Sequence, residues 1–125
     1  MKKCMIQIDE AAYVFRKYAR LGLDRRALSP FEVYAVICGV SKSERKALKL
    51  LSVYDTVRLL SLIAPETLEA LRSVYFFDRG RAPQKNQISH RVLRFATERH
   101  LDERTVYRYL KKAKDLYYHL LGEER

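Results

Sequence analysis

Apolar residues recur along most of this chain at intervals of three and four positions, the spacing of one face of an α-helix. Glycine and proline interrupt the pattern most clearly over residues 79–86. Before this break we expect helices over residues 8–21 and 30–40, a third that starts at Ser41 or Ser43 and reaches residue 63, and a fourth over residues 65–75. After it we expect one beginning near residue 87 and one over residues 103–121. No strand pattern competes with them. The sequence therefore predicts an all-α fold, with an N-terminal helical bundle (1–78), a basic linker (79–86) and a C-terminal helix-turn-helix (87–125).

Local signals set several of these helix ends. Ser29 is a capping residue, Pro30 suits the first helical position, and Glu32 follows in the first turn. Pro65 opens a later helix in the same way, and Gly22 should end the first one.

The residues between the last two predicted helices fit a tight turn. Ala96 is small enough for two helices to cross closely there. His100 occupies a position that tends toward positive φ, where glycine is usual and histidine is better tolerated than a β-branched residue. Leu101 is the apolar plug of the turn, and Asp102 is a natural N-cap whose side chain can accept hydrogen bonds from the next turn. The last helix should therefore begin near Glu103.

The last two helices are both predicted to be amphipathic. The final helix has an apolar stripe made of Val106, Tyr109, Leu110, Ala113, Tyr117 and Leu120. Its opposite side carries Arg104, Arg108 and Lys111, flanked by Tyr107 and Lys112. The shorter helix before it should bury Ile88, Val92, Phe95 and Ala96, and expose Gln87, Arg91, Arg94 and Glu98.

This C-terminal sequence resembles a known class of DNA-binding domains. The run Asp-Glu-Arg-Thr-Val-Tyr-Arg-Tyr-Leu at 102–110, followed by Lys-Lys-Ala-Lys, resembles the recognition helices of sigma-factor region-4-like domains. Together with Ile-Ser-His-Arg-Val at 88–92, it is similar to the small phage and prophage transcriptional regulators of the autolysin-regulator (ArpU) and RinA type. The resemblance implies control of late phage or prophage genes in a Gram-positive host.

A helix-turn-helix reader places its second helix in the major groove while the first crosses the backbone. The residues expected to reach base edges are Arg104, Tyr107 and Arg108. An arginine paired with guanine is worth about 1–3 kcal/mol of discrimination. Phosphates would be neutralised by Arg91, Arg94, Lys111 and Lys112.

Composition agrees with a nucleic-acid partner without selecting one. The chain has 25 Lys and Arg residues against 15 Asp and Glu residues, a formal net charge of +10. This excess suits double-stranded DNA, but it suits RNA or an acidic protein equally well. Two alternatives to a DNA-binding regulator therefore stay open, an RNA-binding antiterminator and a protein–protein adaptor.

The N-terminal helices are richer in apolar residues than one narrow stripe requires, notably at Leu59-Leu60 and Phe76-Phe77. Such a surface could bury against a second copy, which would bring two recognition helices to one operator, or it could dock on RNA polymerase. The third interpretation is that all of these side chains form an internal core.

No pattern of catalytic or metal-binding residues stands out. The three histidines lie at no metal-ligand interval from cysteines or acids, no nucleophile motif such as G-x-S-x-G occurs, and no glycine-rich phosphate loop is present. We expect a non-enzymatic protein without a cofactor.

Cys4 and Cys38 are far apart, and no apolar run approaches a membrane span or a signal peptide. A cytoplasmic location with reduced thiols is the simplest interpretation.

Overall fold

The computed structural model describes residues 9–24, 28–76 and 87–122, and the regular structure in these ranges is helical throughout. The elements are α1 (Glu10–Arg20), α2 (Pro30–Val40), α3 (Glu44–Ile63), α4 (Pro65–Leu71), the π-helical segment η1 (Arg72–Phe76), α5 (Gln87–Arg99) and α6 (Glu103–Leu121). The all-α prediction is confirmed. The predicted basic linker, residues 79–86, lies outside the described residues.

The helix ends follow local chemistry. At the start of α2, the Ser29 hydroxyl accepts a hydrogen bond from the Glu32 N–H at 3.2 Å, and the Glu32 carboxylate accepts one from the Ser29 N–H at 2.8 Å. At the start of α3, the Ser43 hydroxyl accepts from the Lys46 N–H at 3.2 Å. After α1, Gly22 has a φ of +75°, a value that glycine adopts without strain. These reciprocal bonds satisfy backbone groups that a helix end would otherwise leave unpaired.

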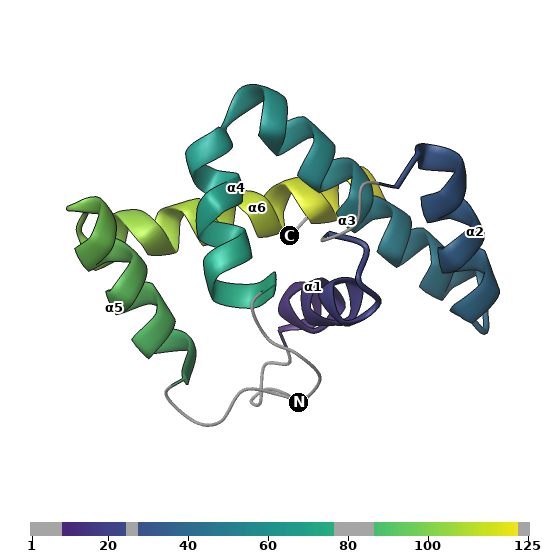
Figure 1. Cartoon of the computed structure of the whole chain (residues 1–125), viewed down its shortest axis with the longest axis horizontal. Helices are drawn as coiled ribbons and strands as arrows, with labels where there is room; N and C mark the ends of the chain where they lie inside the picture. The colour runs from purple at the N-terminus through teal and green to yellow at the C-terminus, as the bar shows by residue number, and fades with distance from the viewer. Residues whose placement is uncertain (1–8, 25–27, 77–86, 123–125) are drawn as a thin grey trace.

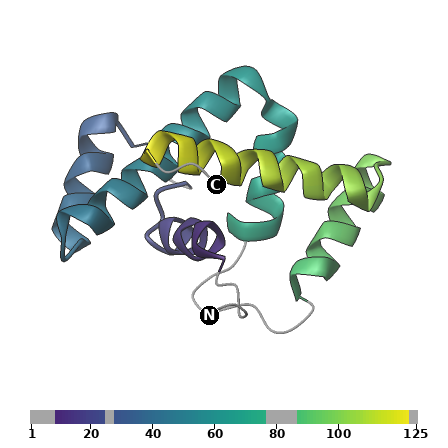
Figure 2. The ribbon, with the colours of Figure 1, turned by 180° about the vertical axis from the view of Figure 1, so that it is seen from behind.

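The long helix α6 crosses the molecule from one side toward the other, and the remaining helices gather around it (Figure 1). It packs against α3 and α4 as well as against α5. The same arrangement is seen from behind in Figure 2, where α2 and α5 again lie at opposite ends. An aromatic cluster joins the helices near the centre, because the Phe15 ring lies edge-on to Tyr117 at 5.6 Å and to Phe76 at 6.2 Å.

The described residues on either side of the predicted linker share this one core. It combines side chains of α1, α2, α3, α4, η1, α5 and α6. Helices from before and after the predicted linker therefore pack against each other. Of the apolar pairs considered for a second copy, Leu60 and Phe76 are buried inside the core, Leu59 is partly exposed, and Phe77 lies outside the described residues. Leu60 is buried because α6 packs against α3, and Phe76 is buried because its ring packs against Phe15 and Tyr18 of α1.

One polar contact reinforces this packing. Lys114 of α6 forms an ion pair with Asp9, and its ammonium lies 5.1 Å from the centre of the Tyr75 ring. Burial alone lowers the pKa of Lys114, but interaction with Tyr75 and Asp9 outweighs burial and the pKa is raised. The lysine therefore keeps its charge while it joins α6 to α1 and η1.

Among the described residues, no helix combines the length and the apolar character needed to cross a membrane. Cys38 is a free, exposed thiol, and Cys4 lies outside the described residues.

Candidate nucleic-acid interface

The turn between α5 and α6 has the geometry that its sequence predicts. His100 has a φ of +58°, and no other non-glycine residue in the described part of the chain has a positive φ. The His100 N–H donates to the Thr97 carbonyl at 3.3 Å, and the Leu101 N–H donates to the Ala96 carbonyl at 2.8 Å. These two bonds form a Schellman motif, in which a left-handed residue ends the helix and satisfies its last carbonyls.

The cap of α6 is only partly as expected. Asp102 is the N-cap residue, since its backbone is extended and its carbonyl accepts hydrogen bonds from the Thr105 and Val106 N–H groups at 3.1 and 3.3 Å. Its carboxylate makes no capping hydrogen bond, so the prediction of a side-chain cap is wrong. The exposed carboxylate still lies beside the positive end of the helix dipole, where a negative charge is favourable.

The apolar sides of both helices are largely buried as predicted, although Ile88 of α5 is only half-buried. Val92, Phe95 and Ala96 of α5 are buried, and α6 buries four residues of its stripe, Val106, Leu110, Ala113 and Tyr117. Tyr109 and Leu120 are half-buried at the edges of that stripe. The rotation of α6 about its axis is therefore fixed by the core, and its opposite side faces away from the protein.

That opposite side carries the basic residues. Arg104, Tyr107, Arg108, Lys111 and Lys112 are all exposed. Arg108 donates from Nη2 to the Thr105 hydroxyl at 3.0 Å, a contact within α6. Arg104 and Lys112 make no hydrogen bond or ion pair within the described structure. We call the exposed side formed by these five residues the outer face of α6.

One acidic residue interrupts the outer face of α6. Asp115 accepts a hydrogen bond from the Lys111 ammonium at 2.8 Å, and both side chains are largely exposed. An exposed pair four residues apart on a helix contributes only about 0.3–0.5 kcal/mol. Lys111 can therefore exchange this partner for a phosphate at small cost. Sequence reasoning overlooked Asp115, although its spacing from Lys111 was a visible signal.

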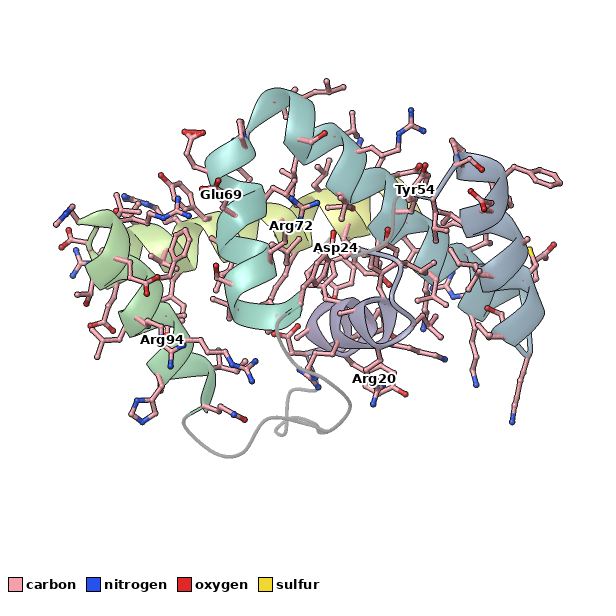
Figure 3. All side chains as sticks on the ribbon, in the orientation of Figure 1. Arg20, Asp24, Tyr54, Glu69, Arg72 and Arg94 are labelled. Carbon is pink, nitrogen blue, oxygen red and sulfur yellow. The ribbon has the colours of Figure 1, made fainter. Side chains whose placement is uncertain are left out.

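The two arginines of α5 that were predicted to bind phosphate differ in what they contact. Arg91 is half-buried, and its Nη1 donates to the Val74 carbonyl of η1 at 2.8 Å, so the prediction that Arg91 is exposed is wrong. The carbonyls at a helix end lack partners within the helix, and Arg91 supplies one across the interface. Arg94 is exposed on α5 (Figure 3) and makes no hydrogen bond or ion pair within the described structure.

An open groove of about 470 Å³ lies between η1 and α5. It is lined by Ser73, Gln87, His90, Arg91, Arg94, Phe95 and Glu98. Both arginines predicted to bind phosphate thus line one groove, together with His90, which sequence reasoning had left without a role. The four-residue spacing of His90 and Arg94 on α5 was the available signal.

Arg99, at the end of α5, is engaged in the fold. It forms an ion pair with Glu69 of α4, and its guanidinium lies 4.8 Å from the centre of the Phe95 ring. Because Glu69 lies thirty positions earlier in the chain, this pairing could not be recognised from the local sequence.

The described residues contain no group of three or more His, Cys, Asp and Glu side chains that could hold a metal ion. Comparison of the chain with protein-family models, with curated proteins and with solved structures found no match.

Proposed function

We propose that the protein is a sequence-specific DNA-binding transcription regulator that inserts the outer face of α6 into the major groove of double-stranded DNA. One observation carries this proposal. The core fixes α6 by its buried stripe, and the opposite side presents two arginines and two lysines with no contact outside their own helix. A helix that follows a tight turn and is held in this way can enter a groove without losing its packing.

The residue roles follow from position along α6. Arg104, Tyr107 and Arg108 lie in its first two turns, the part of a recognition helix that reaches base edges. We assign Lys111 and Lys112, one turn later, to phosphates. These contacts release counterions and make binding salt-dependent.

The arginines of α5 take different parts in this proposal. Arg94 is free to neutralise a phosphate as α5 crosses the DNA backbone. Arg91 uses one guanidinium donor on Val74, and it also lines the groove between η1 and α5. We therefore assign Arg91 to positioning α5, with phosphate contact as a secondary role.

The resemblance of residues 88–114 to phage and prophage regulators supports a narrower version of the proposal. In it the protein acts in the cytoplasm on phage-derived promoters, with RNA polymerase as a further partner. The chemistry of α6 does not depend on this narrower version.

The test is binding measured by fluorescence anisotropy at about 0.15 M salt. Labelled probes are a pool of genomic duplex fragments and matched RNA hairpins. The key variant is Arg104→Ala/Arg108→Ala. The matched control, Arg20→Ala/Arg58→Ala, also removes two exposed arginines, but from α1 and α3. Both variants therefore lower the net charge equally.

We expect selective duplex binding that the key variant weakens by about fivefold or more per arginine, because a bidentate contact to guanine is worth about 1–3 kcal/mol. The control should reduce binding slightly and equally on all sequences. Preference for RNA hairpins would replace the proposal with an antiterminator. Weak, unselective binding that both variants change alike would refute the DNA-binding proposal and favour a protein–protein adaptor.

A further inference from the structure

Helix α2 is apolar on the side that faces away from the core as well as on the side that faces it. It buries only Val33 and Ile37. Phe31 is 83% exposed and Tyr34 54% exposed, and Cys38 is exposed beside them. At about 100° per residue these three side chains fall on one side of the helix. We call this exposed side the outer face of α2.

A helix that is apolar all round is normally covered on all sides. The one charged residue of α2, Glu32, is held at the helix start by its bonds with Ser29. Ala35 and Gly39 border the outer face, and a Cβ added at Gly39 would meet nothing within 4 Å. These small residues leave room for the backbone of another helix to approach closely.

The charge distribution indicates which partner fits. The chain carries a formal net charge of +10, so two copies repel each other over most approaches. Of the described helices of eleven residues or more, α2 is the one without lysine or arginine. An acidic partner would gain nothing from this helix, whereas two identical uncharged faces can meet without bringing basic helix residues together. A two-fold dimer requires such a self-complementary patch.

We propose that the outer face of α2 is a self-association surface that binds the same face of a second copy of this chain. α2 lies at the end of the molecule opposite α5 (Figures 1 and 2), so this contact leaves α5 and the start of α6 uncovered. A helix of eleven residues is only about 16 Å long. A pair of such helices buries less than the roughly 800 Å² per partner of a standard interface, so the dimer should dissociate on dilution.

This inference is independent of DNA binding and is tested without DNA. Sedimentation equilibrium of the full chain, over concentrations from about 1 µM to several hundred µM, measures the monomer–dimer equilibrium. The test variants Phe31→Lys and Tyr34→Lys each place a like charge near the two-fold axis. The control Leu62→Lys makes the same kind of change at an apolar side chain that is 80% exposed, near the end of α3.

We expect the parent chain and Leu62→Lys to dimerise equally, and both α2 variants to raise the dissociation constant at least tenfold. All three substitutions are at exposed side chains, so far-UV circular dichroism should be unchanged. A parent chain that stays monomeric over the whole concentration range overturns the proposal. The outer face of α2 would then be a candidate binding surface for a different protein. A dimer that survives both α2 variants, or that Leu62→Lys alone abolishes, assigns the interface elsewhere and equally overturns it.

Discussion

Replacing His100 by glycine is expected to stabilise the protein, although the change removes a whole side chain. His100 has a φ of +58° at the end of α5 and is exposed, and its side chain makes no hydrogen bond or ion pair within the described structure. Its backbone N–H bond to Thr97 would be kept, because glycine adopts the same left-handed conformation without steric cost. The substitution therefore removes strain and loses no contact.

The magnitude follows from two opposing effects. A residue with a Cβ costs about 1–2 kcal/mol in the left-handed conformation. Glycine restores that energy but loses about 0.5–1 kcal/mol more backbone entropy on folding. The net gain for His100→Gly should be about 0.5–1 kcal/mol, which corresponds to a rise in Tm of about 2–5 °C for a chain of this size. His100→Val should instead destabilise by about 1 kcal/mol or more, because a β-branched side chain is poorly tolerated at positive φ.

Urea unfolding followed by far-UV circular dichroism measures these differences. The control is Thr97→Gly, three positions earlier within α5 and also exposed. Thr97 has an ordinary helical backbone, so glycine there should destabilise by several tenths of a kcal/mol. The opposite signs at Thr97 and His100 are the diagnostic result. If glycine destabilises at both positions, or if valine is tolerated at His100, the left-handed turn does not exist in solution.

Two further predictions concern the core. Burial, followed by the charge of Asp24, raises the pKa of Tyr18 above its usual value near 10. The folded state therefore holds this proton more tightly, and Tyr18 contributes stability that is complete below pH 10 and lost at up to about 1.4 kcal/mol per pH unit above it. Urea unfolding at pH 9 and pH 11 should show Tyr18→Phe losing less stability than the parent chain, and an equal loss would contradict the assignment. Leu110→Ala, at a side chain that is 2% exposed, should cost about 2–5 kcal/mol, whereas Leu93→Ala, at one that is 48% exposed, should cost under about 1 kcal/mol. A small effect at Leu110, measured by the same denaturation, would mean that α6 is only loosely attached to the core.

The sequence by itself determined the features that depend on near neighbours. Helix starts such as Ser29 and Ser43, the break at Gly22 and the left-handed residue at His100 were all predictable. The hydrogen bonds that create them join residues three to five positions apart, so the local sequence contains both partners. The buried stripe of α6 was predictable for the same reason, because helical periodicity is a local property.

Tertiary structure alone decided what the exposed and charged residues do. Arg91 meets Val74 across the interface, Arg99 pairs with Glu69, and Lys114 pairs with Asp9. The partners of these residues come from other helices, between 17 and 105 positions away, so no local pattern could assign them. The exposed side of α2 was likewise not predictable from the sequence. Its sequence is apolar all round and gives no preference for one side, so which side is buried depends on the position of α3 in the folded chain.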